Sequence, residues 1–115
     1  MHELSIVETL IEQVDKEVAR SGHQGRIVRL ELVIGRLSGV CVDSIRFAFE
    51  LLSAETPLEG SQIDIREPRA SCRCRACGAS CEIEEIVAAC PQCGSGDIVI
   101  EGGQDLLLQS IELEA

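Results

Sequence analysis

Four cysteines in two pairs are the residues whose type and spacing most clearly predict chemistry. Cys74 and Cys77 form one C-x2-C pair, Cys90 and Cys93 form a second, and twelve residues separate the pairs. Four thiolates at this spacing can converge tetrahedrally on one metal ion. A glycine directly follows each pair, and its conformational freedom lets backbone N–H groups point at the sulfurs. The pattern predicts a four-cysteine metal site, with Zn(II) favoured and iron left open by spacing alone.

A site of four thiolates is structural rather than catalytic, because no coordination position remains for water. Its metal would supply folding free energy to a segment of about 35 residues, which is too short to fold on an apolar core alone. The other interpretation of a C-x2-C pair is a redox dithiol, but neither pair lies in a βαβ pattern. Cys41, Cys72 and Cys81 remain as buried or incidental thiols, and Cys72 offers an alternative first ligand.

The N-terminus holds a second candidate site. The α-amine of Met1, the amide nitrogen of His2 and its imidazole can close two fused chelate rings on one cation, and Glu3 follows directly. Nitrogen donors in a plane suit Ni(II) or Cu(II). Judged by residue type alone, a histidine at position two is more often an ordinary terminal residue than a ligand.

Composition excludes several functional classes. The chain has 115 residues, seven cysteines and a formal charge of −10, with two Phe and no Trp or Tyr. The few aromatic residues argue against binding nucleic acid by base stacking, and the acidic balance argues against binding its phosphate backbone. No nucleic acid is therefore expected as a partner. No apolar run suits a membrane span, and the start Met1-His2-Glu3 lacks the basic residues of a signal peptide. A cytoplasmic protein with reduced thiols is therefore predicted.

The hydrophobic pattern predicts the elements that position these residues. Apolar residues at helical spacing predict a first helix over residues 4–18. A second helix is predicted after the first strand, and its predicted buried side consists of Ile45, Phe47, Ala48, Leu51 and Leu52. Alternation predicts strands at 27–34, 62–67 and 106–114. In the last strand, alternation places Leu107, Ile111 and Leu113 on one face and Leu106, Leu108, Ser110 and Glu112 on the other.

These elements predict an α+β fold with an insertion. A small three-stranded sheet would carry two helices on one face, and an inserted all-β zinc-ribbon-like domain would carry the four-cysteine site. Residues 1–69 and 104–115 would form the first domain, and residues 70–103 would form the zinc-binding domain. The acid excess lies mostly in residues 76–115, which hold eight acidic residues and no Lys or Arg.

Several motifs, in order along the chain, resemble those of the HypA/HybF family of nickel metallochaperones for hydrogenase maturation. They are the Met1-His2-Glu3-Leu4-Ser5 start, Val33-Ile34-Gly35, Phe47-Ala48-Phe49-Glu50, the two cysteine pairs and the closing Gln109-Ser110-Ile111-Glu112. The resemblance spans the whole chain. Its most specific part is the Met-His-Glu start combined with cysteine pairs at this separation.

The resemblance implies a metal carrier that is not an enzyme. It implies Ni(II) bound at the N-terminus through Met1, by its amine and backbone, and through His2, with Glu3 near the site. It also implies structural Zn(II) held by the four paired cysteines. Some family members have histidines in the zinc segment, whereas both histidines of this chain lie before residue 24.

The resemblance also implies partners. The family works with a partner GTPase, HypB, and delivers nickel to the large subunit of [NiFe]-hydrogenase, while some relatives also serve urease maturation. Separately from the resemblance, two copies of the chain could exchange a helix or the last strand, so the sequence also allows a homodimer. The alternatives are a zinc-ribbon interaction adaptor without nickel delivery, a thiol redox enzyme and a rubredoxin-like electron carrier.

Overall fold

The chain forms two compact units in a computed structural model that describes residues 3–22 and 25–114. The first unit comprises Met1–Leu32, Val40–Ile65 and Leu107–Ala115. The second comprises Val33–Gly39 and Arg66–Leu106. Each unit therefore draws on segments that are far apart in the sequence.

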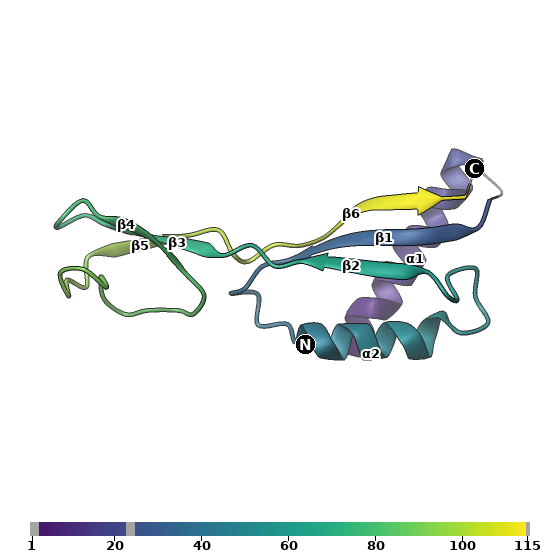
Figure 1. Ribbon diagram of the computed structural model, residues 1–115, viewed down its shortest axis with the longest axis horizontal. Helices are drawn as coiled ribbons and strands as arrows, with labels where there is room; N and C mark the ends of the chain where they lie inside the picture. Colours follow the sequence, from purple (N-terminus) through teal and green to yellow (C-terminus); the bar gives the residue numbers. More distant parts are fainter. Residues whose placement is uncertain (1–2, 23–24, 115) are drawn as a thin grey trace. The chain divides into compact units, whose positions relative to one another are not determined.

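The first unit is built on a three-stranded sheet ordered β2-β1-β6. β2 (Gln62–Arg66) runs parallel to β1 (Ile27–Ile34), whereas β6 (Leu106–Leu113) runs antiparallel to it (Figure 1). Two adjacent parallel strands need a crossover connection, and α2 (Val42–Ser53) supplies it. α1 (Glu3–Ser21) precedes β1 and packs against α2.

Both helices cover one face of this sheet, as predicted (Figure 1). Leu30, Leu32 and Ile34 of β1 are buried, whereas Arg29 and Glu31, which alternate with them, are partly exposed. The guanidinium of Arg29 forms ion pairs across the three strands, with Glu31 at 3.7 Å, Asp64 at 3.4 Å and Glu112 at 3.4 Å. The middle of the sheet is therefore apolar towards the helices and charged on the opposite face, as a mixed sheet covered on one side should be.

The predicted buried side of α2 is wrong at two positions. Phe47 is 63% exposed and Leu51 is 57% exposed, whereas Phe49 is only 3% exposed. Counting from Ile45, the inward residues fall at i+3, i+4 and i+8, which is the spacing of one helix face. Phe47 and Leu51 stand two and six residues from Ile45 and point away from that face. The apolar residues of α2 are thus spread over more than one face, and the predicted set includes two exposed residues and omits the buried Phe49.

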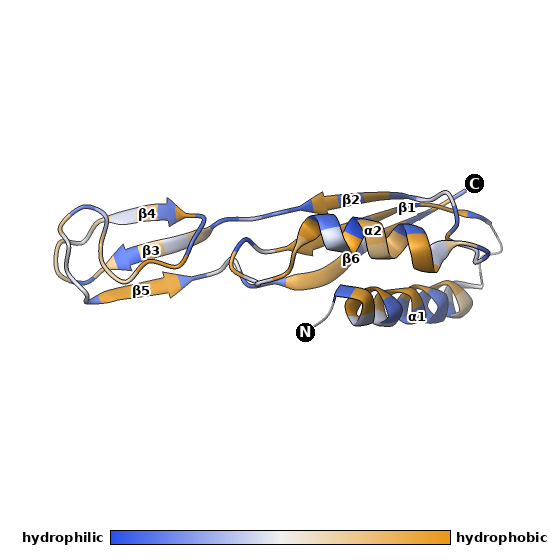
Figure 2. Cartoon of the chain, turned by 90° about the horizontal axis from the view of Figure 1, so that it is seen from below, coloured by the Kyte–Doolittle hydropathy of each residue, from blue (hydrophilic) through white to orange (hydrophobic). Residues whose placement is uncertain are grey.

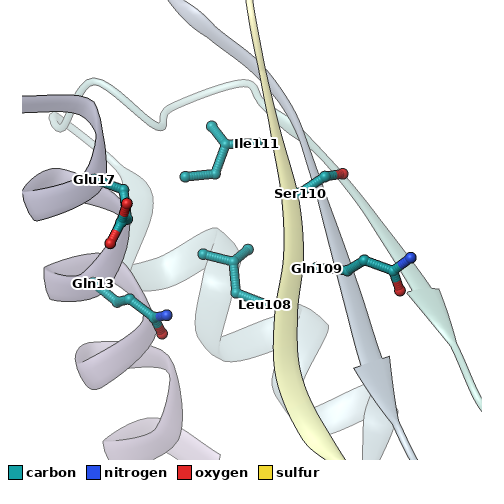
Figure 3. Close-up of a pocket in the computed structure, with 6 residues that line it drawn as sticks. All are labelled: Gln13, Glu17, Leu108, Gln109, Ser110 and Ile111. Carbon is teal, nitrogen blue, oxygen red and sulfur yellow. The ribbon is translucent and has the colours of Figure 1, made fainter. Parts of the chain in front are cut away.

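The facing predicted for the last strand is also wrong. Figure 3 shows Leu108 and Ile111 on the side of β6 that faces α1, and Gln109 and Ser110 on the other side. Strict alternation would place residues three apart on opposite faces. Two consecutive side chains share the outer side here, so the alternation is interrupted between Leu108 and Ile111.

The second unit is an antiparallel sheet ordered β4-β3-β5, which confirms the predicted all-β insertion. β3 (Ala70–Cys74) is central, between β4 (Ser80–Ile83) and β5 (Ile98–Glu101). β5 is apolar over almost its whole length (Figure 2). The core consists of the buried Ala70, Cys72 and Ile83, with Leu37, Cys81, Val87, Ile98 and Ile100 packed against them.

The segment Val33–Gly39 belongs to the second unit, where its backbone is hydrogen-bonded to the backbone around Gly103. The N–H of Gly35 donates to the carbonyl of Asp105 at 2.7 Å, and the N–H of Leu37 donates to the carbonyl of Gly103 at 2.6 Å. A Cβ atom on Gly35 would lie 2.2 Å from the carbonyl carbon of Gly103. Only glycine permits this approach of two backbones.

Candidate metal centre

Each cysteine pair lies in a tight turn closed by glycine. In the first turn, the N–H of Gly78 donates to the carbonyl of Cys74 at 3.1 Å, and Gly78 adopts a φ of 77°. In the second, the N–H of Gly94 donates to the carbonyl of Cys90 at 2.9 Å, with a φ of 80° at Gly94. This left-handed conformation is unfavourable for other residues, which explains the glycine after each pair.

The two turns also direct backbone N–H groups at sulfur. The N–H of Cys77 lies 3.4 Å from the Sγ of Cys74, and the N–H of Gln92 lies 3.3 Å from the Sγ of Cys90. Such donors stabilise a thiolate and so favour the form that binds metal. β3 carries the first turn directly, because Cys74 is its last residue.

The four sulfurs converge on one point. The Sγ atoms of Cys74 and Cys93 lie 3.6 Å apart, those of Cys77 and Cys90 lie 3.8 Å apart, and all four lie within 4.8 Å of one another. A tetrahedral site with metal–sulfur bonds of about 2.3 Å has sulfurs about 3.8 Å apart. The arrangement therefore fits one zinc-sized ion, and its donor set of four sulfurs fits zinc or iron. Cys74 and Cys90 are buried, whereas Cys77 and Cys93 are exposed.

Electrostatics within the cluster favours a bound cation. The backbone N–H groups of Cys93 and Gln92 lower the pKa of Cys90 to about 7. The N–H of Ser95 favours the Cys93 thiolate, but the sulfurs of its three neighbours, together with partial desolvation, outweigh it and raise the pKa of Cys93 to about 12. The fourfold thiolate is therefore unfavourable without a counter-charge. A divalent cation at the centre would remove that repulsion.

Cys72 and Cys81 lie outside this cluster, opposite one another on β3 and β4. Cys72 is only 1% exposed, and burial raises its pKa, with a further contribution from the Cys81 thiol. The sequence analysis treated both as buried or incidental thiols, kept Cys72 as an alternative first ligand, and missed that the two residues lie opposite one another. The cluster of four sulfurs contains Cys74 and not Cys72. Cys72 and Cys74 are two residues apart in a strand, so the sequence could predict that both lie on the same face of β3. The sequence could not predict that Cys81 lies opposite Cys72, because that register depends on the length of the turn between β3 and β4.

The predicted nickel residues fall at the edge of the described chain. Met1 and His2 lie outside the described residues, whereas Glu3 opens α1. The carboxylate of Glu3 accepts a hydrogen bond of 3.2 Å from the backbone N–H of Cys41, the residue before α2. Cys41 is exposed, and the hydroxyl and amide of Ser44 lower the pKa of its thiol. The start of α1 thus lies beside the start of α2.

A pocket of about 250 Å³ opens in the first unit between α1 and β6 (Figure 3). Gln13 and Glu17 line its helix side, and Leu108 and Ile111 line its strand side. The carboxylate of Glu17 also pairs with Arg20 at 3.2 Å. Among the described residues that line the pocket there is no cysteine or histidine, so it does not resemble a site for a soft or borderline metal ion.

Within the described residues, no helix is both long enough and apolar enough to cross a membrane.

A family model described as "Hydrogenase/urease nickel incorporation, metallochaperone, hypA" matches residues 1–113. Hydrogenase maturation factor HypA of Chlorobium limicola is 41% identical over 114 residues, which cover 99% of this chain and 97% of that protein. The HypA of Chlorobaculum parvum is 39% identical over 114 residues, covering 99% of this chain and all of that protein.

Solved structures are similar over the whole length. The solution structure of the Ni metallochaperone HypA from Helicobacter pylori is 25% identical, with a TM-score of 0.64 and coverage of 100% of this chain and 99% of that chain. A second solution structure, of a HypA protein, gives a TM-score of 0.68 at 24% identity and is similar in fold. Both likenesses span the helical unit and the cysteine-bearing unit together.

Proposed function

Because this chain belongs to the HypA family of hydrogenase/urease nickel-incorporation metallochaperones, we propose that it binds Ni(II) at its N-terminus and delivers it to the large subunit of [NiFe]-hydrogenase. The family consists of metal carriers, so the chain is not an enzyme, in agreement with the prediction from sequence. The match of residues 1–113 to the family carries the proposal, because it includes both the Met-His-Glu start and the four clustered cysteines.

The proposed nickel ligands are nitrogen donors at the start of the chain. The amine and backbone of Met1 and the imidazole of His2 would bind Ni(II), and Glu3 would stand beside the site. A terminal arm has few protein ligands and no rigid cage, so it can exchange its ion, as a carrier must. Ni(II) accepts such nitrogen donors, whereas thiolates favour Zn(II).

The second metal is proposed to be structural Zn(II), held by Cys74, Cys77, Cys90 and Cys93. The sulfur separations of 3.6 and 3.8 Å support this assignment, because they match the tetrahedral spacing for zinc. Four thiolates leave no open coordination position, so the ion would hold the two turns together and take no part in transfer. We propose residues 70–103 as the zinc-binding domain, and residues 1–69 with 104–115 as the nickel-binding domain.

The proposed partners follow from the family. A GTPase, HypB, would act with the chain during delivery, and urease maturation proteins would be further recipients in organisms that use them. The net charge of −10 suits a basic surface on such a partner. The work would take place in the cytoplasm, where the seven cysteines stay reduced.

Nickel titration tests the central part of the proposal. Untagged protein with an unextended N-terminus should bind one Ni(II) by calorimetry, and His2→Ala should weaken that binding by more than about tenfold. His23→Ala is the matched control, because it removes the other histidine and should leave the affinity unchanged. One extra residue before Met1 should weaken binding as His2→Ala does, since it displaces the amine.

The same samples separate this function from its alternative. Zinc content should stay near one ion per chain in every variant. Unchanged nickel affinity in both His2→Ala and the extended protein would contradict the N-terminal site. Zinc without any nickel binding would instead favour a zinc-ribbon interaction adaptor.

A further inference from the structure

A second pair of thiols lies on the same sheet as the metal cluster. Cys72 on β3 and Cys81 on β4 are directly opposite one another in the antiparallel register. Both belong to the core of the second unit, where Cys72 is 1% exposed and Cys81 is half-buried against it. Neither sulfur belongs to the cluster of four.

The backbone bonds identify the kind of pair that these two residues form. The N–H of Cys74 donates to the carbonyl of Ala79 at 2.9 Å, so Cys74 and Ala79 face each other as a hydrogen-bonded pair. Pairs of this kind recur every second residue in an antiparallel ladder, and Cys72 and Cys81 are the next one. Their Cα atoms are therefore about 5.5 Å apart, within the roughly 4.4 to 6.8 Å that a disulfide spans.

We propose that Cys72 and Cys81 form a redox-active dithiol, which a low-molecular-weight disulfide converts into a cross-strand disulfide. The Cys81 thiolate, on the more exposed residue, attacks one sulfur of the small disulfide and expels one small thiolate. The Cys72 thiolate then attacks the Cys81 sulfur and expels the second. In total the two protein thiols lose two protons and two electrons, and the small disulfide is reduced to two thiols.

The geometry makes this disulfide reversible. Opposite residues have Cβ atoms about 4.5 to 5.5 Å apart, closest in pairs without hydrogen bonds, whereas a relaxed disulfide needs about 3.5 to 4.5 Å. The strands must therefore close slightly, and a strained disulfide is more easily reduced. The cross-link would join β3 to β4 on either side of the turn that carries Cys77, so it would brace that turn without using a metal ligand.

The test uses zinc-loaded full-length protein carrying Cys41→Ala, which removes the exposed thiol of the first unit. Oxidised glutathione is added, remaining thiols are alkylated, and peptides are mapped by mass spectrometry while bound zinc is measured by atomic absorption. Both thiols outside the cluster should be lost together, a peptide joined through Cys72 and Cys81 should appear, and zinc should stay at one per chain. A dithiol reductant should restore both thiols.

Two further variants, in the same Cys41→Ala background, distinguish a dithiol from two unrelated thiols. With Cys72→Ala, Cys81 should accumulate as a stable mixed disulfide with glutathione, because the resolving thiol is missing. With Cys81→Ala, Cys72 should stay reduced, because it is buried. The proposal is overturned if glutathione stays on Cys81 while Cys72 is present, if only cluster cysteines oxidise as zinc is lost, or if no thiol reacts.

Discussion

The carboxylate of Glu3 accepts a hydrogen bond from the backbone N–H of Cys41 at 3.2 Å, joining the first turn of α1 to the N-terminus of α2. Glu3 therefore places a negative charge beside the positive end of the α2 dipole. Any ligand arm formed by the residues before Glu3 begins from this anchored point.

Removing this carboxylate should loosen the junction of the two helices. We expect Glu3→Ala to lower the free energy of unfolding by about 1 kcal/mol, the usual cost of losing an N-terminal helix contact. Urea denaturation followed by circular dichroism measures it. Glu8→Ala is the control, because Glu8 is exposed on the same helix, and an equal loss in both variants would contradict a specific role for Glu3.

The two phenylalanines of α2 should differ sharply in their contribution to stability. Phe49 is 3% exposed and Phe47 is 63% exposed, so Phe49→Ala should cost about 3 to 5 kcal/mol and Phe47→Ala less than about 1 kcal/mol. Chemical denaturation of the two single variants provides the comparison. If Phe47→Ala lowered the free energy of unfolding as much as Phe49→Ala, the Phe47 side chain would have to be covered in solution, which would contradict the prediction.

Gly35 should be the glycine least tolerant of a side chain. A Cβ there would lie 2.2 Å from backbone atoms of Gly103, whereas a Cβ on Gly96 would meet nothing closer than 3.9 Å among the described residues. We expect Gly35→Ala to destabilise the second unit by more than about 2 kcal/mol and Gly96→Ala to be nearly neutral. Amide hydrogen exchange of β3 and β5 would report this. Unchanged exchange in Gly35→Ala would show that the two backbones can separate at little cost.

The Cys41 thiol should react at a lower pH than an ordinary cysteine. The Ser44 hydroxyl, followed by the Ser44 amide, lowers its pKa, so the thiolate forms at a lower pH in the folded chain than in the unfolded one. This thiolate therefore stabilises the fold above the unfolded pKa, and the contribution disappears as the pH falls through the folded pKa.

Alkylation by iodoacetamide, followed by peptide mapping, measures this shift. The rate at Cys41 should rise at a lower pH in native protein than in urea, and Ser44→Ala should move the native profile towards the denatured one. Coinciding native and denatured profiles would rule out the effect of Ser44.

Local features were the ones that sequence reasoning could predict. The two glycine-closed turns depend on residues within five positions of each other, so spacing alone indicated the four-cysteine cluster. Strands and helices followed from periodicity in the same way. The wrong orientations had two causes. Phe47 and Leu51 are apolar residues outside the covered face of α2, and the alternation of β6 is interrupted between Leu108 and Ile111.

Contacts between distant segments could not be predicted in this way. Glu3 and Cys41 meet only because α1 and α2 pack together, and no local pattern encodes that packing. The pairing of Cys72 with Cys81 depends on the register that the first turn imposes. The segment Val33–Gly39 joins the second unit through backbone bonds, which leave no signature in hydrophobicity.

The bonds of Val33–Gly39 mean that the second unit cannot be isolated as one continuous fragment. A peptide of residues 66–106 would lack Leu37, which packs on the core of that unit, and would leave the carbonyls of Pro68 and Gly103 without their donors. To fold, such a peptide would need the segment Val33–Gly39 supplied as a separate peptide. The unit is therefore suited to fragment complementation, in which binding of a short synthetic peptide containing Gly35 would report whether the larger fragment has folded.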